Sequence, residues 1–221
     1  MELFCYSSKI DQRFWSDNNI NIDSESVIAD GVKIGRNVSI TNSRICEGVV
    51  IDGNSRISNS VVDANVRIDN SCIDGAEIAE GVSVGPYARI RQGTSVGRGS
   101  RIGNFVEIKN ASLGSDCKIA HLAYVGDAHI GDNCNIGCGV IFCNYDGECK
   151  RCTVVGDNVF IGSNVNLVAP VVIGDDAYIA AGSTITMDVG VAEFAIARAR
   201  QENKKNFKNP YKNMKKQTNN R

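Results

Sequence analysis

Proline, histidine and aromatic residues are scarce in this sequence, and long apolar runs are missing. Among 221 residues there are 3 prolines and 2 histidines, and aromatic residues make up 6%. A core built around bulky rings is therefore not expected, whereas frequent isoleucine and valine suit a narrow core of stacked strands. No apolar run reaches the length needed to cross a bilayer, and residues 1–14 lack the apolar segment of a secretory signal. These absences predict a cytoplasmic protein without a membrane span.

Cysteine is plentiful, but its pattern does not favour disulfides. The count is 9, an odd number, in a chain for which no export signal is found. Such a chain is expected to keep reduced thiols. Cys117 and Cys134 each lie two residues before an isoleucine of the repeat described below, where a free cysteine acts as a small hydrophobic residue.

Charge is divided unevenly between the body of the chain and its end. Residues 198–221 hold nine Lys or Arg and one acid, a net charge of +8, so the other 197 residues carry −9. A basic end on an acidic body predicts a local anionic partner. Nucleic acid is not expected, because no base-stacking pattern accompanies the basic residues.

A branched aliphatic residue recurs every six positions along most of the chain. One run is Val84, Ile90, Val96, Ile102 and Ile108, and further runs lie on either side of it. Small or β-branched residues stand two positions earlier, and Gly, Asn or Asp often follows. A helix would need a spacing near 3.6, whereas a period of six is typical of a parallel β-helix with three strands per coil. About nine coils of roughly 18 residues, stacked about 4.8 Å apart, would make a prism about 40 Å long.

The repeat is expected to lapse in three places, and function concentrates where a regular scaffold is interrupted. One is the polar stretch 143–152, which must project outward. Another is 121–127, which contains His121. The third follows Val189, where 192–206 could form a short helix or a tail. His129 stands in an ordinary repeat position, so an exposed structural role is expected for it.

Four strings carry a closer resemblance, strongest between residues 85 and 198. They are Ile102-Gly-Asn-Phe-Val-Glu-Ile-Lys109, Ala120-His-Leu-Ala-Tyr-Val-Gly-Asp127, Asn135-Ile-Gly-Cys-Gly139 and Cys143-Asn-Tyr-Asp-Gly147. Together they resemble the acetyltransferase half of the bifunctional bacterial N-acetylglucosamine-1-phosphate uridyltransferases, which are hexapeptide-repeat transferases. The resemblance implies a left-handed β-helix and a homotrimer with active sites between subunits. It also implies acetylation of glucosamine-1-phosphate by acetyl-CoA in UDP-N-acetylglucosamine biosynthesis.

The resemblance assigns roles residue by residue. His121 matches the general base, and a neutral imidazole can accept a proton from an amine near pH 7. Glu107 could orient this imidazole or hold the substrate amine. The positions that match sugar-phosphate ligands are Arg91, Lys109, Tyr124, Asn135 and Lys150. The positions that match acetyl-CoA contacts are Cys138, Asn144, Tyr145, Ser163, Ala181 and Arg198.

One assigned position and one residue beside an assigned position depart from the family pattern. Cys138 replaces the usual Ala, and Gln92 replaces the Pro that usually follows the phosphate-binding Arg. No metal is expected for acetyl transfer. The Cys149-Lys-Arg-Cys152 string could hold zinc or act as a redox pair, but no second pair follows it, so a plain loop is the leading interpretation.

Three segments are expected: an N-terminal extension over 1–20, the β-helix over 21–190, and a basic segment over 191–221. The nucleotidyl-transfer half is not found in the sequence, so no uridyltransferase activity is expected. Two rival functions stay open. The acceptor could be a different, nucleotide-linked amino sugar used in surface polysaccharides, or the chain could be a trimeric scaffold without activity.

Overall fold

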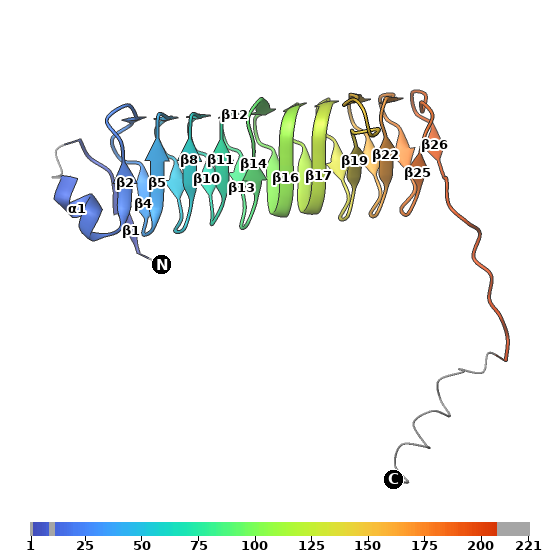
Figure 1. Cartoon of the computed structure of the whole chain (residues 1–221), viewed down its shortest axis with the longest axis horizontal. Coiled ribbons are helices and arrows are strands. Elements are labelled where there is room, and N and C mark those ends of the chain that lie inside the picture. Colours follow the sequence, from blue (N-terminus) through green and yellow to red (C-terminus); the bar gives the residue numbers. More distant parts are fainter. Residues whose placement is uncertain (1, 9–11, 207–221) are drawn as a thin grey trace, which may run out of the picture.

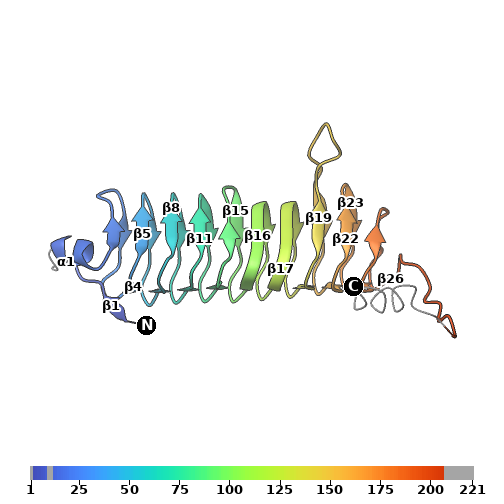
Figure 2. The ribbon, with the colours of Figure 1, turned by 60° about the horizontal axis from the view of Figure 1, so that its bottom comes forward.

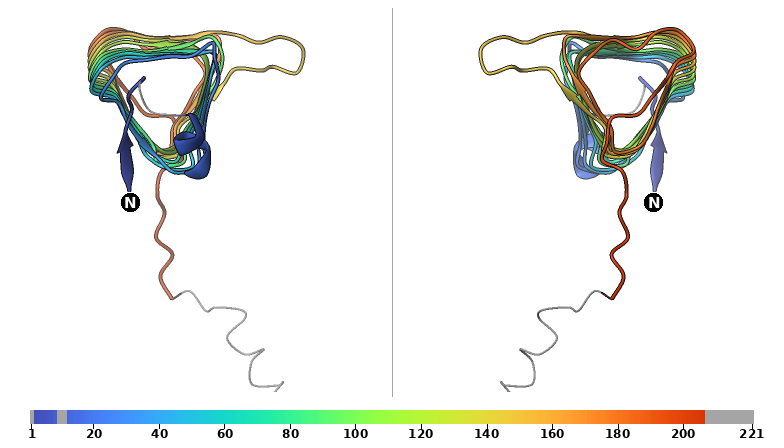
Figure 3. Two further views of the ribbon diagram at one scale, coloured as in Figure 1. Left: turned by 90° about the vertical axis from the view of Figure 1, so that its left-hand side faces the viewer. Right: turned by 90° about the vertical axis from the view of Figure 1, so that its right-hand side faces the viewer.

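The chain forms an elongated triangular prism of stacked parallel strands. The computed structural model describes residues 2–8 and 12–206. Figure 1 shows the strands following one another along a single axis, and the end-on views of Figure 3 show the triangle. Apart from β1, all named strands pair in parallel within one 26-stranded sheet. The structure is thus the parallel β-helix that the six-residue period predicts, and it is consistent with the left hand that the resemblance implies.

Each side of the prism is a column of strands in parallel register. Face 1 consists of β4 (Lys33–Gly35), β7 (Val50–Ile51), β10 (Arg67–Ile68), β13 (Ser83–Val84), the first parts of β16 (Arg101–Leu113) and β17 (Lys118–Ile130), β18 (Asn135–Ile136), β21 (Phe160–Ile161), β24 (Tyr178–Ile179) and β26 (Phe194–Ala195). Face 2 consists of β2 (Ile20–Ile22), β5 (Val38–Thr41), β8 (Arg56–Ser58), β11 (Cys72–Asp74), β14 (Arg89–Ile90), the middle parts of β16 and β17, β19 (Ile141–Cys143), β22 (Asn166–Val168) and β25 (Thr184–Ile185). Face 3 consists of β3 (Val27–Ile28), β6 (Arg44–Ile45), β9 (Val61–Val62), β12 (Ala76–Ile78), β15 (Thr94–Val96), the last parts of β16 and β17, β20 (Thr153–Val155) and β23 (Val171–Ile173).

The core is the column of aliphatic residues that point inward. Ile34, Ile51 and Ile68 are stacked neighbours on face 1, and each is fully buried. Burying one such side chain contributes roughly 1.5–3 kcal/mol, so the repeat holds the prism together coil by coil. Cys117 and Cys134 are also fully buried, which confirms their place in the small inward slot.

The corner between faces 1 and 2, here the 1–2 corner, has an unusual backbone. One residue in each coil has a positive φ there: Asn37, Asn54, Asn70, Tyr87, Phe105, Leu122, Gly139, Asn164 and Gly182. Asn and Gly tolerate this left-handed conformation, whereas bulky apolar residues adopt it rarely. The three apolar members occupy consecutive coils, and each side chain is 58–59% exposed.

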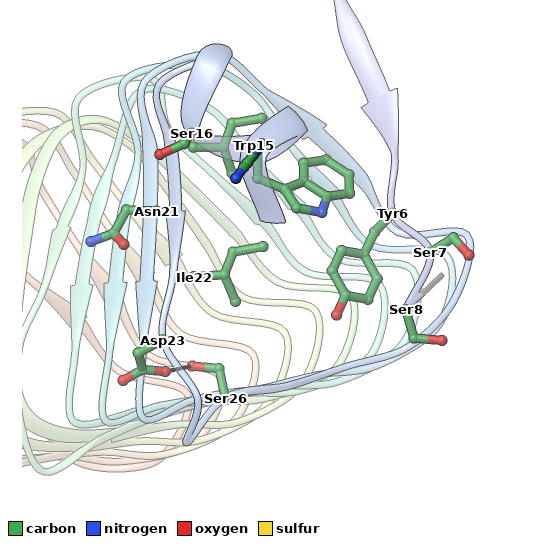
Figure 4. A pocket seen from close by; sticks show the side chains of 11 residues that line it. Tyr6, Ser7, Ser8, Trp15, Ser16, Asn21, Ile22, Asp23 and Ser26 are labelled. Carbon is green, nitrogen blue, oxygen red and sulfur yellow. Dashed lines mark hydrogen bonds between the residues drawn. The ribbon is translucent and has the colours of Figure 1, made fainter. Parts of the chain in front are cut away.

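A short cap closes the N-terminal end of the prism. Strand β1 (Leu3–Cys5) pairs antiparallel with β4, and helix α1 (Gln12–Asp17) buries Trp15 over the open coil. The rings of Tyr6 and Trp15 stack with centroids 5.4 Å apart. Beside them lies a cavity of about 430 Å³ whose rim carries Asp23 and Ser26, joined by a hydrogen bond of 2.6 Å (Figure 4).

At the other end, residues 192–206, expected to form a short helix or a tail, contain no helix. Residues 194–195 form β26, which adds another rung beside β24. The ring of Phe194 contacts that of Tyr178, which in turn stacks on Phe160, with centroids 5.6 and 4.6 Å apart. Stacking on the existing aromatic column therefore extends the sheet here. After β26 the chain leaves the prism (Figure 1), and residues 207–221 of the predicted basic segment lie outside the described residues.

Of the two internal interruptions, only one is present. The interruption expected at 121–127 is wrong, because β17 runs without a break and stays in register with β16. The second expectation is confirmed: the segment 144–151 projects from the prism as a loop, the gold excursion in Figures 2 and 3. None of the helices that the structure describes is long and apolar enough to cross a membrane.

Candidate active site

One row of side chains stands directly before the positive-φ positions on the 1–2 corner. In successive coils it contains Asn104, His121, Cys138, Ser163 and Ala181, each three residues before the paired face 2 positions. Backbone hydrogen bonds between neighbouring coils fix this stacking, such as Asn164 N to Cys138 O at 2.8 Å and Gly182 N to Ser163 O at 2.8 Å. The predicted base and three of the predicted acetyl-CoA contacts therefore lie along a single line, which the sequence analysis did not foresee.

His121 is exposed and is held by the side chain one coil below it. Its Nδ1 lies 2.8 Å from Oδ1 of Asn104. Since a carbonyl oxygen can only accept, this arrangement places the proton on Nδ1 and leaves the lone pair of Nε2 available as a base. Sequence reasoning assigned the orienting role to Glu107 as one of two options and missed Asn104.

Glu107 instead pairs with Arg91 on face 2. The distance from Arg91 Nη1 to Glu107 Oε1 is 2.7 Å, and both side chains are about one-third exposed. Tyr124 stands above Glu107 in the next coil. Glu107, Arg91 and Tyr124 thus form the middle of face 2, between the 1–2 corner and the corner where the loop departs.

Cations gather where face 2 meets the projecting loop. Lys109 lies in the coil above Arg91, and Lys150 reaches it from the loop. Close contact with the Lys150 ammonium, then repulsion from Arg91, holds the pKa of Lys109 below its ordinary value despite the nearby Asp127 carboxylate. Three like charges brought together in this way favour an anion between them.

The base of the loop is anchored to face 2 by Asn144. Its amide donates to the carboxylate of Asp127 and, at 3.4 Å, to the hydroxyl of Tyr124. Burial opposes ionisation of Asp127, but hydrogen bonds from Asn110 and Asn144 outweigh it and lower its pKa. A side chain on Gly126 would meet the Tyr124 hydroxyl at 2.5 Å and the Asn144 amide at 2.7 Å. Gly126 is therefore required for this packing.

The tip of the loop is ordered by Asp146. Its carboxylate accepts hydrogen bonds from the backbone of Cys149 and Glu148 and from Arg151, which together lower the pKa of Asp146 to about 2. Tyr145 is 61% exposed and donates its hydroxyl proton to Gly147 O at 2.6 Å. Cys149 and Cys152 are free thiols, as are the other seven cysteines. Within the described residues, no group of three or more His, Cys, Asp or Glu side chains has an arrangement that could hold a metal ion.

The remaining predicted residues lie along or beside the 1–2 corner. Cys138, Ser163 and Ala181 are small, so the corner is open along its outer edge. Arg198 closes the row by donating to Ala181 O at 2.8 Å. Asn135 projects from face 1, stacked between Lys118 and Phe160, and lies on the opposite side of the corner from Tyr124.

Sequence reasoning missed Asn104, Gly126 and Asp127 as members of the site. A signal was present for Asn104, because it stands 17 residues before His121, the same step that separates Lys109 from Gly126. One coil of the repeat therefore brings both pairs into contact. The requirement for glycine at 126 could not be predicted without knowing where the loop returns.

Comparison with known proteins shows which repeats and relatives the chain resembles. The bacterial transferase hexapeptide family (six repeats) matches residues 75–110 and 152–186. The bifunctional protein GlmU of Clostridium botulinum (strain Langeland) is 44% identical over 191 residues, which cover 86% of this chain and 41% of the relative. The chain therefore carries the hexapeptide repeat of bacterial transferases and is similar over most of its length to part of GlmU. This confirms the resemblance seen in the four sequence strings.

Further relatives and solved structures differ in their sequence identity to this chain and in the share of each chain that is covered. GlmU of Pseudomonas putida (strain GB-1) is 45% identical over 199 residues, which cover 90% of this chain and 40% of the relative. The chain thus spans about two fifths of the length of the curated relatives it matches. Among solved structures, a perosamine N-acetyltransferase from Caulobacter crescentus in complex with CoA and GDP-perosamine aligns with a TM-score of 0.47 and 18% identity. That alignment covers 62% of this chain and 81% of the other.

Proposed function

We propose that this chain transfers the acetyl group of acetyl-CoA to the amine of glucosamine-1-phosphate, a step toward UDP-N-acetylglucosamine in the cytoplasm. The observation that carries the proposal is the layout of one region of the prism. A histidine with a free Nε2 stands at one edge of face 2, and three cations stand at the other. Glucosamine-1-phosphate carries its amine and its phosphate on neighbouring carbons, and this face offers a partner for each group.

The chemistry required of the chain is proton transfer. The neutral amine nitrogen attacks the thioester carbonyl carbon, the bond between carbon and sulfur breaks, and CoA leaves as the thiolate. His121 Nε2 takes the proton that the nitrogen must lose and can return it to the leaving sulfur. Glu107 is placed to hold the amine once a phosphate draws Arg91 away from it.

Arg91, Lys109 and Lys150 would bind the phosphate. A guanidinium can hold two phosphate oxygens at once, and the two ammonium groups act as point charges. Gly126 lies five positions after His121 on the same strand, so their Cα atoms are at most roughly 16 Å apart. Lys109 stands beside Gly126 in the neighbouring coil. The acceptor and the thioester together would lie across this span, with Tyr124 between their ends.

Acetyl-CoA would lie along the 1–2 corner. From His121 the row continues for about four coils to Arg198, or roughly 19 Å at about 4.8 Å per coil. The small side chains of Cys138, Ser163 and Ala181 would let an extended arm approach the backbone. Arg198 would meet the CoA phosphates at the far end, while Asn144 and Tyr145 would contact the ligand from the loop.

A homotrimer fits the exposed apolar residues of the same corner. Tyr87 and Phe105 stack with centroids 5.7 Å apart, and Leu122 continues the stripe beside His121. Large exposed apolar side chains beside a site favour coverage by a partner. A second copy of the chain would supply that cover, and Asn135 on face 1 could then serve a site shared between subunits.

One observation favours the alternative of a nucleotide-linked amino sugar. Arg89 and Arg56 lie on face 2 below Glu107, separated only by Cys72 in the outward column. A second phosphate on the acceptor could reach Arg89. The scaffold alternative is not favoured, because a scaffold does not require an oriented histidine beside a cation cluster.

The test is release of CoA thiol across a panel of acceptors. Glucosamine-1-phosphate, glucosamine, glucosamine-6-phosphate and a nucleotide-linked amino sugar would be compared at matched concentrations. We expect the largest kcat/KM for glucosamine-1-phosphate. Preference for the nucleotide-linked sugar would support the alternative, and the absence of thiol release with every acceptor would leave only the scaffold.

A further inference from the structure

Asn104 and His121 occupy equivalent places in adjacent coils. Their backbones pair in register, and within the part of the chain that the structure describes the one side-chain hydrogen bond of His121 joins its Nδ1 to Asn104 Oδ1 at 2.8 Å. Asn104 is half-buried, whereas His121 is exposed. The imidazole therefore depends on the coil below it for its orientation.

The backbone holds this pair in place from both sides. A Cβ added to Gly103 would lie 1.8 Å from Ala120 O, so the two coils meet closely just before the pair. Just after it, Phe105 and Leu122 turn the corner with φ values of 57° and 32°. Such conformations persist only where the surrounding structure enforces them. The contact between Asn104 and His121 is therefore part of a rigid corner.

We propose that Asn104 is a positioning residue that fixes the reactive tautomer of His121. This inference rests on the proposed function, in which His121 is the base. Asn104 Oδ1 accepts a hydrogen bond from the Nδ1–H group and so directs the Nε2 lone pair away from the prism. A free imidazole could instead rotate, or carry its proton on Nε2 and be unable to act as a base.

The neutral charge of Asn104 is part of the inference. A carboxylate in the same place would favour the imidazolium and keep the base protonated to higher pH. An amide orients the ring without adding this charge. The chain has a carboxylate nearby, Glu107, but it is bound to Arg91 at 2.7 Å.

Other titratable groups surround the pair but leave this contact unchanged. Arg101 and Lys118 lie on face 1 before the corner, Glu107 and Tyr124 lie on face 2 after it, and Cys138 lies one coil above. Among the hydrogen bonds of the described residues, none joins any of these five to His121. These five groups are the same in Asn104→Ala, Asn104→Asp and Ser112→Ala. Differences in kcat or pH dependence between these variants therefore come from the substituted residue.

The chain also provides a matched control. His129 is the only other histidine, and its Nδ1 lies 2.7 Å from Ser112 Oγ, in the coil directly below. Both pairs are separated by 17 residues and lie on the same two strands. Ser112→Ala therefore removes the same type of contact between coils at a histidine outside the proposed site.

The experiment compares Asn104→Ala, Asn104→Asp, Ser112→Ala and His121→Ala in the full chain. For each we would measure kcat, KM for both substrates, the pH dependence of kcat/KM, and the nitrogen NMR signals of the two histidines. For Asn104→Ala we expect kcat to fall roughly 10- to 100-fold with little change in KM, as for other groups that orient a functional histidine. The signal of His121 should then show a mixture of tautomers.

Asn104→Asp should restore most of kcat at high pH, because the carboxylate can also accept a hydrogen bond from the Nδ1–H group. Its acid limb should move to higher pH by about one unit or more. Ser112→Ala should change the NMR signal of His129 and leave kcat unaltered. Full kcat and an unchanged His121 signal in Asn104→Ala would overturn the inference, whatever the stability of the variant. Retention of acetyl transfer by His121→Ala would instead contradict the proposed mechanism, which separates the two failures.

Discussion

The 1–2 corner has the same backbone along its whole length but carries different side chains in the first coils and in the coils around His121. In the N-terminal coils Asn37, Asn54 and Asn70 occupy the positive-φ positions, and their amides bond to one another at 3.0 Å. In the following coils Tyr87 and Phe105 take the same positions and expose their rings. The first arrangement satisfies the turn locally, whereas the second retains strain and presents an apolar surface.

This difference shows where the fold gives way to the needs of a site. An asparagine ladder is a self-contained solution, because the side chain tolerates φ above zero and finds a partner in each neighbouring coil. Replacing it with aromatic residues costs about 1–2 kcal/mol per residue in backbone energy. The replacement occurs beside His121 and not in the first coils. The strained apolar positions therefore mark the same part of the prism as the candidate site.

The largest effect is expected when the equivalent corner residue is removed in each of these two groups of coils. His121→Ala should lower acetyl transfer by about 100- to 10,000-fold, because it removes the base. Arg36→Ala changes the corresponding position in the first coils, where the arginine forms an exposed salt bridge to Glu2 at 2.9 Å and lies over the Phe4 ring, 5.5 Å from its centroid. It should leave turnover unaltered. Thiol release by both variants, with circular dichroism as the folding control, tests this, and equal losses would show that the corner around His121 has no special role in turnover.

A moderate effect is expected when the two solutions for the turn are disturbed. Asn54→Ala should lower the free energy of unfolding by about 2 kcal/mol, since it loses two ladder hydrogen bonds and places alanine at φ 57°. Phe105→Asn should raise it by up to about 1 kcal/mol in the isolated subunit, because asparagine relieves the strain. Denaturant unfolding measures both.

Phe105→Asn should also weaken association and acetyl transfer if a second copy covers the corner. Light scattering across a concentration series would report the association. A Phe105→Asn variant that is less stable as a monomer would show that ring stacking with Tyr87 outweighs the backbone strain. That result would contradict the net cost assigned to the aromatic residues at the corner.

The smallest effect is expected at the tip of the loop, which has no counterpart in the first coils. Asp146→Asn should raise the KM for acetyl-CoA by about two- to fivefold, because a neutral amide holds the backbone of Cys149 less strongly. The folded pKa of Asp146 is lowered from 3.8 to about 2. Its stabilising contribution is therefore fully present above about pH 4 and is lost as the pH falls through 2. Asp30→Asn, at the opposite end of the prism, is the matched control, and an equal rise in KM there would contradict a role for the loop.

The sequence predicts the repeat and the core well, because both follow from a period that is visible in single residues such as Ile102 and Ile108. It also predicts the projecting loop, since a polar stretch with Asp146 and Gly147 cannot enter the core. A short helix, one of the two options after Val189, does not form, because stacking of Phe194 on Tyr178 is a contact between coils, which local propensity does not report. The expected interruption at His121 was wrong for a related reason: a polar residue at a corner leaves the ladder intact.

For the candidate site, the sequence predicts residue types but not who pairs with whom. Resemblance pointed to His121 and Glu107 together, whereas in the structure Glu107 pairs with Arg91 and His121 with Asn104. Partners of this kind are set by the length of a coil. They could have been found by searching 17 residues upstream of each polar residue of interest.

The loop at 144–151 has a wider consequence. Paired residues in the coils on either side of the loop are 25 positions apart in the sequence, as for His129 and Val154. In the preceding coil the corresponding step, from Ser112 to His129, is 17 positions. Eight additional residues are thus accommodated at a corner without shifting a single rung on either side. A scaffold with this property can acquire a new ligand-contacting segment by insertion alone, and lose it by deletion, while its folding code stays unchanged. Each corner of the prism is therefore a position where a segment with new binding or catalytic residues could be inserted.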